Sequence, residues 1–340
     1  MMATIQKRTF LALALGLAAA ASLPATVWAQ TMNAKFSVTL PEKSHQGQGA
    51  ARFAELVGQK TGGRVQIKVY YNAALGNDVQ VTSALQGGTV EFVVPQTSTL
   101  TGMIKDFEVL DYPFLFDSEK EAEAVLDGAI GKRLLDKLPA KGLVGLAYWE
   151  NGFFNATTSK HPIARVEDFA GLKFRAIQAP ISLESIKALG ANPVPLPVPE
   201  VYAALETRTI DGQATPTAVI AALKFNEVQK YLSVIRLSYG AFLPLASKKF
   251  WDKLSPEDQK AIQDAALETR AWQRQVARDA ARNAQVDLAK KGMQVNEVAP
   301  AEIARMRERV KPVWDRFAPG TGAELVKEVV AEVDKVRHAR

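Results

Sequence analysis

One uninterrupted helical segment limits what this chain can fold into. Ser255-Pro256-Glu257-Asp258 combines an N-cap serine, a proline at the first helical position and early acidic residues, as helix starts often do. No Pro or Gly follows until Gly292, which stands where helices commonly end. A helix over 256–291 would be about 54 Å long, which exceeds one small domain. Because its apolar positions keep no strict heptad, we interpret it as an intramolecular spine rather than the alternative, a coiled-coil dimerisation helix.

The segments before the spine alternate between strand and helix patterns. Residues 35–40 and 65–70 alternate apolar and polar side chains like strands, and the apolar spacing in 50–60 between them is helical. This β-loop-α-β order predicts neighbouring strands in a largely parallel sheet. A chain of 340 residues is long enough for two such α/β domains. The pattern restarts after Gly152, so we expect the chain to cross into the second domain there.

The remaining elements follow from the same patterns. We predict strands at 90–94, 143–148, 172–177 and 295–298, and helices at 78–85, 119–138, 182–189, 200–205, 302–314 and 323–336. Residues 192–199 form a Pro-rich connector and 211–216 a polar loop that can face a ligand. The apolar stretch 110–116, which Pro113 interrupts, is expected to pack in the core and between domains.

The first residues have the composition of an export signal. Lys7 and Arg8 precede the apolar run 10–23, and Val27-Trp28-Ala29 ends in a small residue suited to cleavage before Gln30. A membrane anchor is the alternative, but the run is short and Pro24 follows it. We therefore expect residues 1–29 to be a cleaved signal peptide and the mature protein to be periplasmic.

Composition excludes several kinds of site. The chain has no cysteine, and its three histidines, His45, His161 and His338, are far apart in sequence. A thiolate site is therefore excluded, and a histidine-based metal site or catalytic triad has little support. The formal charge of +6 is spread along the chain without a basic run, so nucleic acid is an unexpected partner. We predict no metal, no cofactor and no enzymatic activity.

The stretch 168–180 carries the strongest candidate for ligand binding. Gly171 marks a turn, 172–177 is the predicted strand, and Pro180 marks the loop that follows. Arg175 is thus held on rigid backbone directly before a loop. A guanidinium held in this way can donate two parallel hydrogen bonds to a carboxylate. The alternative is a surface arginine in an ordinary salt bridge.

Several short motifs occur in a characteristic order along nearly the whole mature chain. They are Gly62-Gly63-Arg64-Val65, Leu75-Gly76, Asp111-Tyr112-Pro113-Phe114-Leu115-Phe116, Glu167-Asp168-Phe169-Ala170-Gly171-Leu172-Lys173-Phe174-Arg175, Leu189-Gly190-Ala191, Glu200-Val201-Tyr202-Ala203-Ala204-Leu205 and Asp211-Gly212-Gln213. Together they resemble the solute-binding proteins of tripartite ATP-independent periplasmic (TRAP) transporters, the DctP-like family.

The resemblance implies a two-lobed periplasmic-binding-protein fold with a long spine helix across both lobes. We place lobe I at 30–151 and 241–280 and lobe II at 152–240 and 281–340. The resemblance also implies a monomer that captures a small organic acid by domain closure. The partners would be the small and large TRAP permease subunits, with uptake driven by an ion gradient. In this family the arginine at the position of Arg175 holds the ligand carboxylate.

Two departures from the family pattern bear on the ligand. Phe154 stands where many members have a second arginine, and Thr215 stands where an asparagine commonly supports the carboxylate. The site should therefore hold a less polar ligand, with one carboxylate, a keto or hydroxyl group and an apolar or aromatic body. A second buried, unpaired carboxylate would be costly.

The resemblance assigns further residues to the cleft. His45 in the first loop and Gln96 after the strand 90–94 should line it from lobe I, and His45 could make binding pH-sensitive. Trp149, Phe154 and Val198 are candidate apolar walls, although core packing is an equal alternative for Trp149. Further possible polar contacts are Thr97 and Gln178.

Three other functions remain open from the sequence. The first is a periplasmic enzyme with a binding-protein fold, for which the chain offers no convincing nucleophile–base pair or metal set. The second is a sensory protein that presents its ligand to a receptor kinase, which the sequence alone cannot separate from a transport protein. The third is a C4-dicarboxylate binder.

Overall fold

The computed structural model describes residues 31–339, so the predicted signal peptide lies outside the described residues. From Met32 onward the chain forms one compact α/β unit with two sheets. No helix in residues 31–339 is both long and apolar enough to cross a membrane.

The first sheet contains the predicted β-loop-α-β unit. Strand β1 (Met32–Ser37) pairs in parallel with β2 (Val65–Tyr70), and helix α2 (His45–Lys60) connects them. The described part of this sheet has the strand order β2-β1-β3-β11-β4, in which β3 is Phe92–Val93, β4 is Leu143–Gly145 and β11 is Leu245–Ser247. Helix α3 (Asp78–Gly87) connects β2 to β3. The parallel pairing confirms the prediction from the alternating pattern.

The second sheet has the order β12-β9-β5-β8-β6-β7, and a further strand, β10, pairs with β5. The strands are β5 (Trp149–Thr158), β6 (Lys173–Ala176), β7 (Asn192–Pro195), β8 (Gly212–Pro216), β9 (Tyr231–Val234), β10 (Tyr239–Phe242) and β12 (Gln294–Glu297). Helices α6 (Pro180–Leu189), α7 (Val198–Glu206) and α8 (Thr217–Ala222) follow β6, β7 and β8.

The polar loop predicted at 211–216 is in fact the buried strand β8. It lies between β5 and β6, so its backbone hydrogen bonds are made on both sides. The segment carries Gly, Gln, Ala and Thr instead of large β-branched residues, and sequence patterns therefore gave no strand signal.

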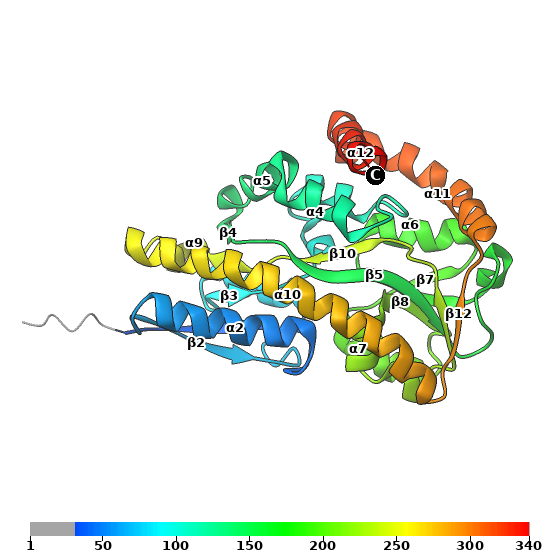
Figure 1. Ribbon diagram of the computed structural model, residues 1–340, viewed down its shortest axis with the longest axis horizontal. Helices are drawn as coiled ribbons and strands as arrows, with labels where there is room; N and C mark the ends of the chain where they lie inside the picture. The colour runs from blue at the N-terminus through cyan, green and yellow to red at the C-terminus, as the bar shows by residue number, and fades with distance from the viewer. Residues whose placement is uncertain (1–30, 340) are drawn as a thin grey trace, which may run out of the picture. The chain divides into compact units, whose positions relative to one another are not determined.

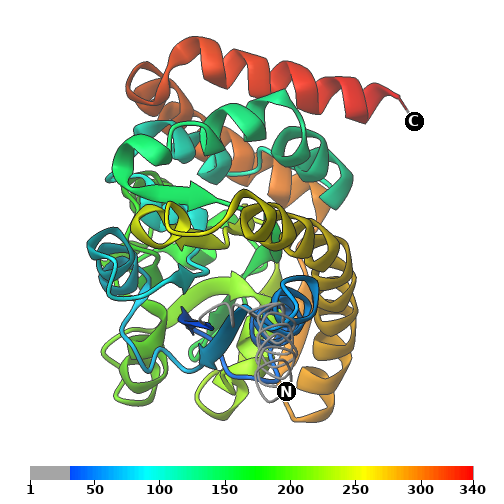
Figure 2. The same cartoon turned by 90° about the vertical axis from the view of Figure 1, so that its left-hand side faces the viewer.

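Helix α10 (Pro256–Lys290) is the predicted spine, and its 35 residues span about 52 Å. It packs against α2 beside the first sheet, as Figures 1 and 2 show, and against α8 and β12 beside the second. Between these contacts the Gln273 amide both donates to and accepts from the backbone of Glu150 in β5, each at 2.8 Å. The two-lobed fold with a spine helix is therefore confirmed.

The helix predicted at 119–138 is broken into α4 (Glu119–Asp127) and α5 (Ala129–Leu135). Gly128 adopts an extended conformation at the break, and an added Cβ would lie 2.5 Å from the Ala124 carbonyl oxygen. The C-terminal helices α11 (Pro300–Thr321) and α12 (Ala323–His338) follow β12, and α12 packs on α4. A short helix, α9 (Lys248–Trp251), follows β11.

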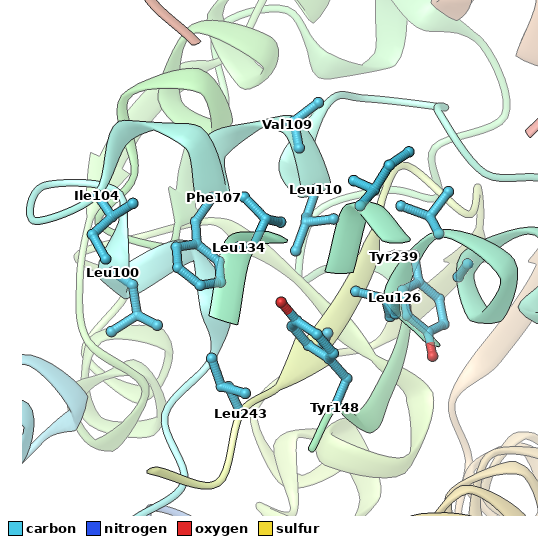
Figure 3. Close-up of a cluster of buried hydrophobic side chains, with 14 of the residues drawn as sticks. Leu100, Ile104, Phe107, Val109, Leu110, Leu126, Leu134, Tyr148, Tyr239 and Leu243 are labelled. Atoms are coloured by element: carbon cyan, nitrogen blue, oxygen red, sulfur yellow. The ribbon is translucent and has the colours of Figure 1, made fainter. Parts of the chain in front are cut away.

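A large apolar cluster surrounds α4 and α5 (Figure 3). It includes Phe107 and Leu110 from the 3₁₀ helix Lys105–Asp111 that follows β3, Leu126 and Leu134 from the two helices, and Tyr239 from β10. The cluster thus joins segments that are far apart in sequence, from the 3₁₀ helix Lys105–Asp111 to strand β10. The lobe boundaries 30–151 with 241–280 and 152–240 with 281–340 stay a prediction.

Candidate functional site

The candidate residues converge because strand directions bring them to facing sheet edges. Strands β6 and β8 are parallel, and β5 runs antiparallel to β8, so the carboxyl ends of β6 and β8 lie beside the start of β5. In the first sheet, β1 and β3 are parallel and their carboxyl ends lead toward His45 and Gln96. Carboxyl edges of this kind are where α/β proteins bind ligands.

Arg175 on β6 is a buried cation, and its residue is only 1% exposed. Its Nε donates to the Leu196 carbonyl oxygen at 2.9 Å, whereas its Nη2 has no hydrogen-bond partner among the described residues. Burial lowers the pKa of the guanidinium to about 10, against the opposing charge of Asp78. Its donors are thus only partly used, as a ligand-binding arginine requires.

Asp78 supplies the acidic group that acts on Arg175. It is the first residue of α3, and its carboxylate accepts hydrogen bonds from the Thr39 hydroxyl and, at 3.1 Å, from the backbone N–H of Gln96. Burial raises the pKa of Asp78 despite these bonds and the nearby Arg175. Sequence reasoning missed this residue, although the Asn77 cap preceding it marks a helix start beside a loop.

Gln96 and Asn151 link the two sheets through a direct hydrogen bond. The Asn151 amide donates to Gln96 Oε1 at 3.2 Å, and Gln96 Nε2 donates to the Ser98 hydroxyl at 3.0 Å. Asn151 Oδ1 has no partner within residues 31–339. Sequence reasoning did not single out Asn151, whose position at the domain crossing was the available signal.

His45 is buried at the start of α2 rather than in a loop, because Ser44 caps the helix one residue before it. Its ring lies against Phe242, with the centroids 5.7 Å apart. Burial lowers the pKa of His45 to about 4, against the smaller opposite effect of Asn151. The imidazole is therefore neutral near pH 7, and the pH-sensitive binding expected from it moves to acidic pH.

This burial predicts how His45→Gln changes the pH dependence of stability. An unfolded histidine takes up a proton near pH 6.5, whereas folded His45 does so only near pH 4. The stability contributed by neutral His45 is complete above pH 6.5 and is lost as pH falls toward 4, by up to about 3 kcal/mol. The wild type should therefore lose more unfolding free energy than the variant between pH 7 and 4 in urea titrations. The same loss in both proteins, or a similar difference for His161→Gln, would contradict this assignment.

Thr215 and Gln213 place further unused polar atoms beside Arg175. Gln213 pairs in register with Arg175, and Thr215 lies two residues further along β8 on the same face. The Thr215 hydroxyl and Gln213 Oε1 are buried and have no hydrogen-bond partner among the described residues. Leaving such groups unsatisfied is costly, so a ligand that bonds them would gain affinity.

A cavity lies next to this group of residues. Gln96 lines it from the first sheet, Phe154 from β5 and Ala176 from β6, directly after Arg175. The centre of a water molecule can reach about 30 Å³ of it. Phe154 pairs with Pro216, so it projects from the sheet face opposite to Thr215. The cavity and the Arg175 side chain are therefore neighbours that do not share a wall.

The other predicted residues take different positions. Trp149 is 0% exposed and packs in the apolar cluster beneath the first sheet, which favours the core alternative over a cleft wall. Gln178 is solvent-exposed in the loop after β6, and its contact with the ligand stays a prediction. Val198 begins α7 and packs, partly buried, against the same cluster as Trp149. Thr97 is buried in the turn after Gln96.

Within residues 31–339, no three His, Asp or Glu side chains lie close enough together to hold a metal ion. What the site offers is a buried guanidinium surrounded by uncharged hydrogen-bonding groups and one carboxylate. This combination suits a small anion with polar substituents.

Comparison with known proteins adds the family. Residues 36–320 match the model of the DctP family, described as bacterial extracellular solute-binding protein family 7. A sugar acid binding protein from Advenella mimigardefordensis, solved with galactonate, is 40% identical with a TM-score of 0.88, over 90% of this chain and 99% of that one.

Two further relatives are also named as solute-binding proteins of this kind. A TRAP periplasmic solute-binding protein from Polaromonas, bound to D-erythronate, is 37% identical with a TM-score of 0.86, over 88% of this chain and 98% of that one. The C4-dicarboxylate-binding periplasmic protein DctP of Rhodobacter capsulatus is 34% identical over 94% of this chain and 95% of that protein. The chain therefore belongs to family 7 of the bacterial extracellular solute-binding proteins, the DctP-like binding proteins of TRAP transporters.

Proposed function

We propose that this protein captures a small organic acid with one carboxylate in the periplasm and delivers it to the small and large subunits of a TRAP permease. The observation that carries the proposal is Arg175, a buried cation whose Nη2 has no hydrogen-bond partner in the described part of the chain. A ligand carboxylate would pair with this charge and use the free donors.

The groups around Arg175 favour a single carboxylate. Thr215, Asn151 and neutral His45 can form hydrogen bonds without adding positive charge, and Asp78 is acidic. A second carboxylate would meet no second cation among these groups, and burying it would be unfavourable. The relatives solved with galactonate and D-erythronate support this choice, whereas the Rhodobacter capsulatus relative keeps a C4-dicarboxylate as the alternative.

Capture would proceed by closure of the two lobes. Gln96 and His45 come from the first sheet and Arg175 and Thr215 from the second, so a ligand touches both sets only when the edges are close together. A ligand with more contacts in the closed form shifts the population toward it. We propose that the permease recognises this closed surface and that the acid is released unchanged. Turnover of candidate acids by the purified protein would contradict a pure binding function.

Replacing Phe154 tests what sets the charge of the ligand. Phe154→Arg would add a second cation in the cavity wall, with Asp111 nearby to offset part of its desolvation. We expect the ratio of succinate to butanoate affinity, measured by calorimetry, to rise about tenfold or more, as for a new charged hydrogen bond. Phe154→Leu keeps the wall apolar and should leave the ratio unchanged. An unaltered ratio in the arginine variant would exclude Phe154 from the ligand's surroundings.

A further inference from the structure

Asp111 is a buried carboxyl group in the cavity wall that the site described above does not use. It ends the 3₁₀ helix Lys105–Asp111 and is 7% exposed. Its Oδ1 accepts a hydrogen bond from the Ser98 hydroxyl. Its Oδ2 is buried and has no hydrogen-bond partner within residues 31–339, and the residue lines the cavity together with Phe154.

Other buried carboxylates of this chain have cationic partners. Glu108 pairs with Lys105 at 2.6 Å, Glu121 with Arg337 at 3.0 Å and Glu150 with Arg278 at 2.8 Å. Asp111 forms no such pair among the described residues. Burial raises the pKa of Asp111 to about 7, opposed by the Ser98 hydrogen bond and reinforced by nearby Glu108. Burying the Asp111 carboxyl group without a cationic partner is energetically unfavourable, so its retention at the cavity calls for an explanation.

The cavity lies beside the carboxylate site, at the carboxyl end of β6. Ala176 and Ile177, which directly follow Arg175, line it together with Gln96. The backbone N–H of Gln96 binds Asp78, the carboxylate that acts on Arg175. Because Arg175 and the cavity lie on opposite faces of the sheet, a ligand with its carboxylate at Arg175 would reach Asp111 by passing its tail around the end of β6 at Ala176.

We propose that Asp111 is a specificity-determining residue that accepts a hydrogen bond from a hydroxyl group on the tail of the bound acid. This inference rests on the proposed function and narrows it to short, hydroxylated monocarboxylates. A second carboxylate at the tail would be repelled by Asp111. A hydroxyl group needs one acceptor, which Asp111 Oδ2 can supply, whereas an ammonium group would have three donors to satisfy.

The test is a thermodynamic cycle between the ligand hydroxyls and Asp111. Calorimetry would compare aldonates of four to six carbons, beginning with D-erythronate, with unsubstituted acids of the same length, on wild type, Asp111→Asn and Asp111→Leu. Because Ser98 already donates to one oxygen, the asparagine variant would present its NH₂ group to the cavity. We expect each variant to weaken aldonate binding about 10- to 100-fold and to change binding of the unsubstituted acid less than about twofold.

Controls separate the ligand contact from a structural role. Asp106→Asn alters an acid of the same 3₁₀ helix whose partner is Lys137 on the surface, and it should leave both affinities unchanged. The asparagine side chain has nearly the same shape as aspartate, so Asp111→Asn alone can complete the thermodynamic cycle if Asp111→Leu fails to fold. Thermal unfolding shows which variants are native.

Several results would overturn the proposal. Equal weakening of aldonate and unsubstituted acid would make Asp111 purely structural, and unchanged aldonate binding would remove the contact. If the wild type binds succinate or 4-aminobutanoate more tightly than every aldonate, the group recognised at the ligand's tail is a carboxylate or an ammonium group and not a hydroxyl group. Failure of the wild type to bind any acid would instead refute the proposed function itself.

Discussion

Arg175→Met should strongly weaken carboxylate binding without lowering the stability of the protein free of ligand. Truncating one partner of a buried charge pair typically costs about 2–5 kcal/mol of binding free energy, or about 30- to several-thousand-fold in affinity. Arg175→Lys keeps the charge but loses the planar fork, so it should retain part of the affinity.

The expected stability of Arg175→Met follows from the burial of the Arg175 guanidinium, whose hydrogen-bond donors are only partly used. Burial lowers the pKa of Arg175 from its usual value to about 10, so the folded state holds this proton less tightly than the unfolded state does. At neutral pH the charged side chain therefore destabilises the fold, by about 3 kcal/mol on this basis. Methionine removes that cost but also removes the Leu196 hydrogen bond and the attraction to Asp78. The net change should lie between zero and a gain of about 2 kcal/mol.

Arg274 is the matched control. It is also a buried arginine, but it binds both oxygens of Asp127 at 2.7 and 2.9 Å and the Tyr148 carbonyl oxygen at 3.0 Å. Arg274→Met should therefore cost about 3–5 kcal/mol of unfolding free energy. Calorimetry and urea denaturation measure both quantities. If Arg175→Met is destabilised as strongly as Arg274→Met, or binds acid with wild-type affinity, Arg175 is a structural residue.

Trp149→Ala should lower the free energy of unfolding by about 3–5 kcal/mol, because it removes a fully buried aromatic side chain from the core. The ring is closely surrounded: an added Cβ at Gly49 would lie 2.9 Å from it. The affinity of the remaining folded protein should change little, since the ring packs in the cluster beneath the first sheet.

Trp272 on α10 provides the comparison, because its side chain is 40% exposed. Trp272→Ala should change stability by no more than about 0.5 kcal/mol. Urea denaturation of the two variants decides between the core and the cleft wall. Near-wild-type stability of Trp149→Ala together with greatly weakened acid binding would restore the wall interpretation.

The spine helix and the parallel β1–β2 pair could be predicted because their signals are local. Ser255 and Pro256 fix the start of α10 whatever surrounds it, and its observed end at Lys290 lies one residue from the predicted one. Strand β8 could not be predicted in this way, since its pairing with β5 and β6 depends on segments far away in sequence. Gly128 similarly breaks a helical pattern only in the packed structure.

The candidate site shows the same division. Arg175 could be proposed from a turn, a strand and a loop in one short stretch, and the family resemblance gave it a role. The roles of Asp78 and Asp111 could not be predicted, because they depend on groups that are distant in sequence. Asp78 acts on the charge of Arg175, and Asp111 lines a cavity built from several segments. Asp111 in particular stands in an apolar stretch expected to pack in the core. The structure shows that it lines the cavity and that its Oδ2 has no partner within residues 31–339.

The central claim is that Arg175 holds the carboxylate of the captured acid, and ligand that copurifies with the protein tests it most directly. Wild type and Arg175→Met would be purified from the same cells, denatured, and the released compounds identified and quantified by mass spectrometry. The account predicts a hydroxylated monocarboxylate in amounts close to one per wild-type molecule and none above background from the variant. A neutral or cationic compound from the wild type, or the same acid retained by Arg175→Met, would contradict it.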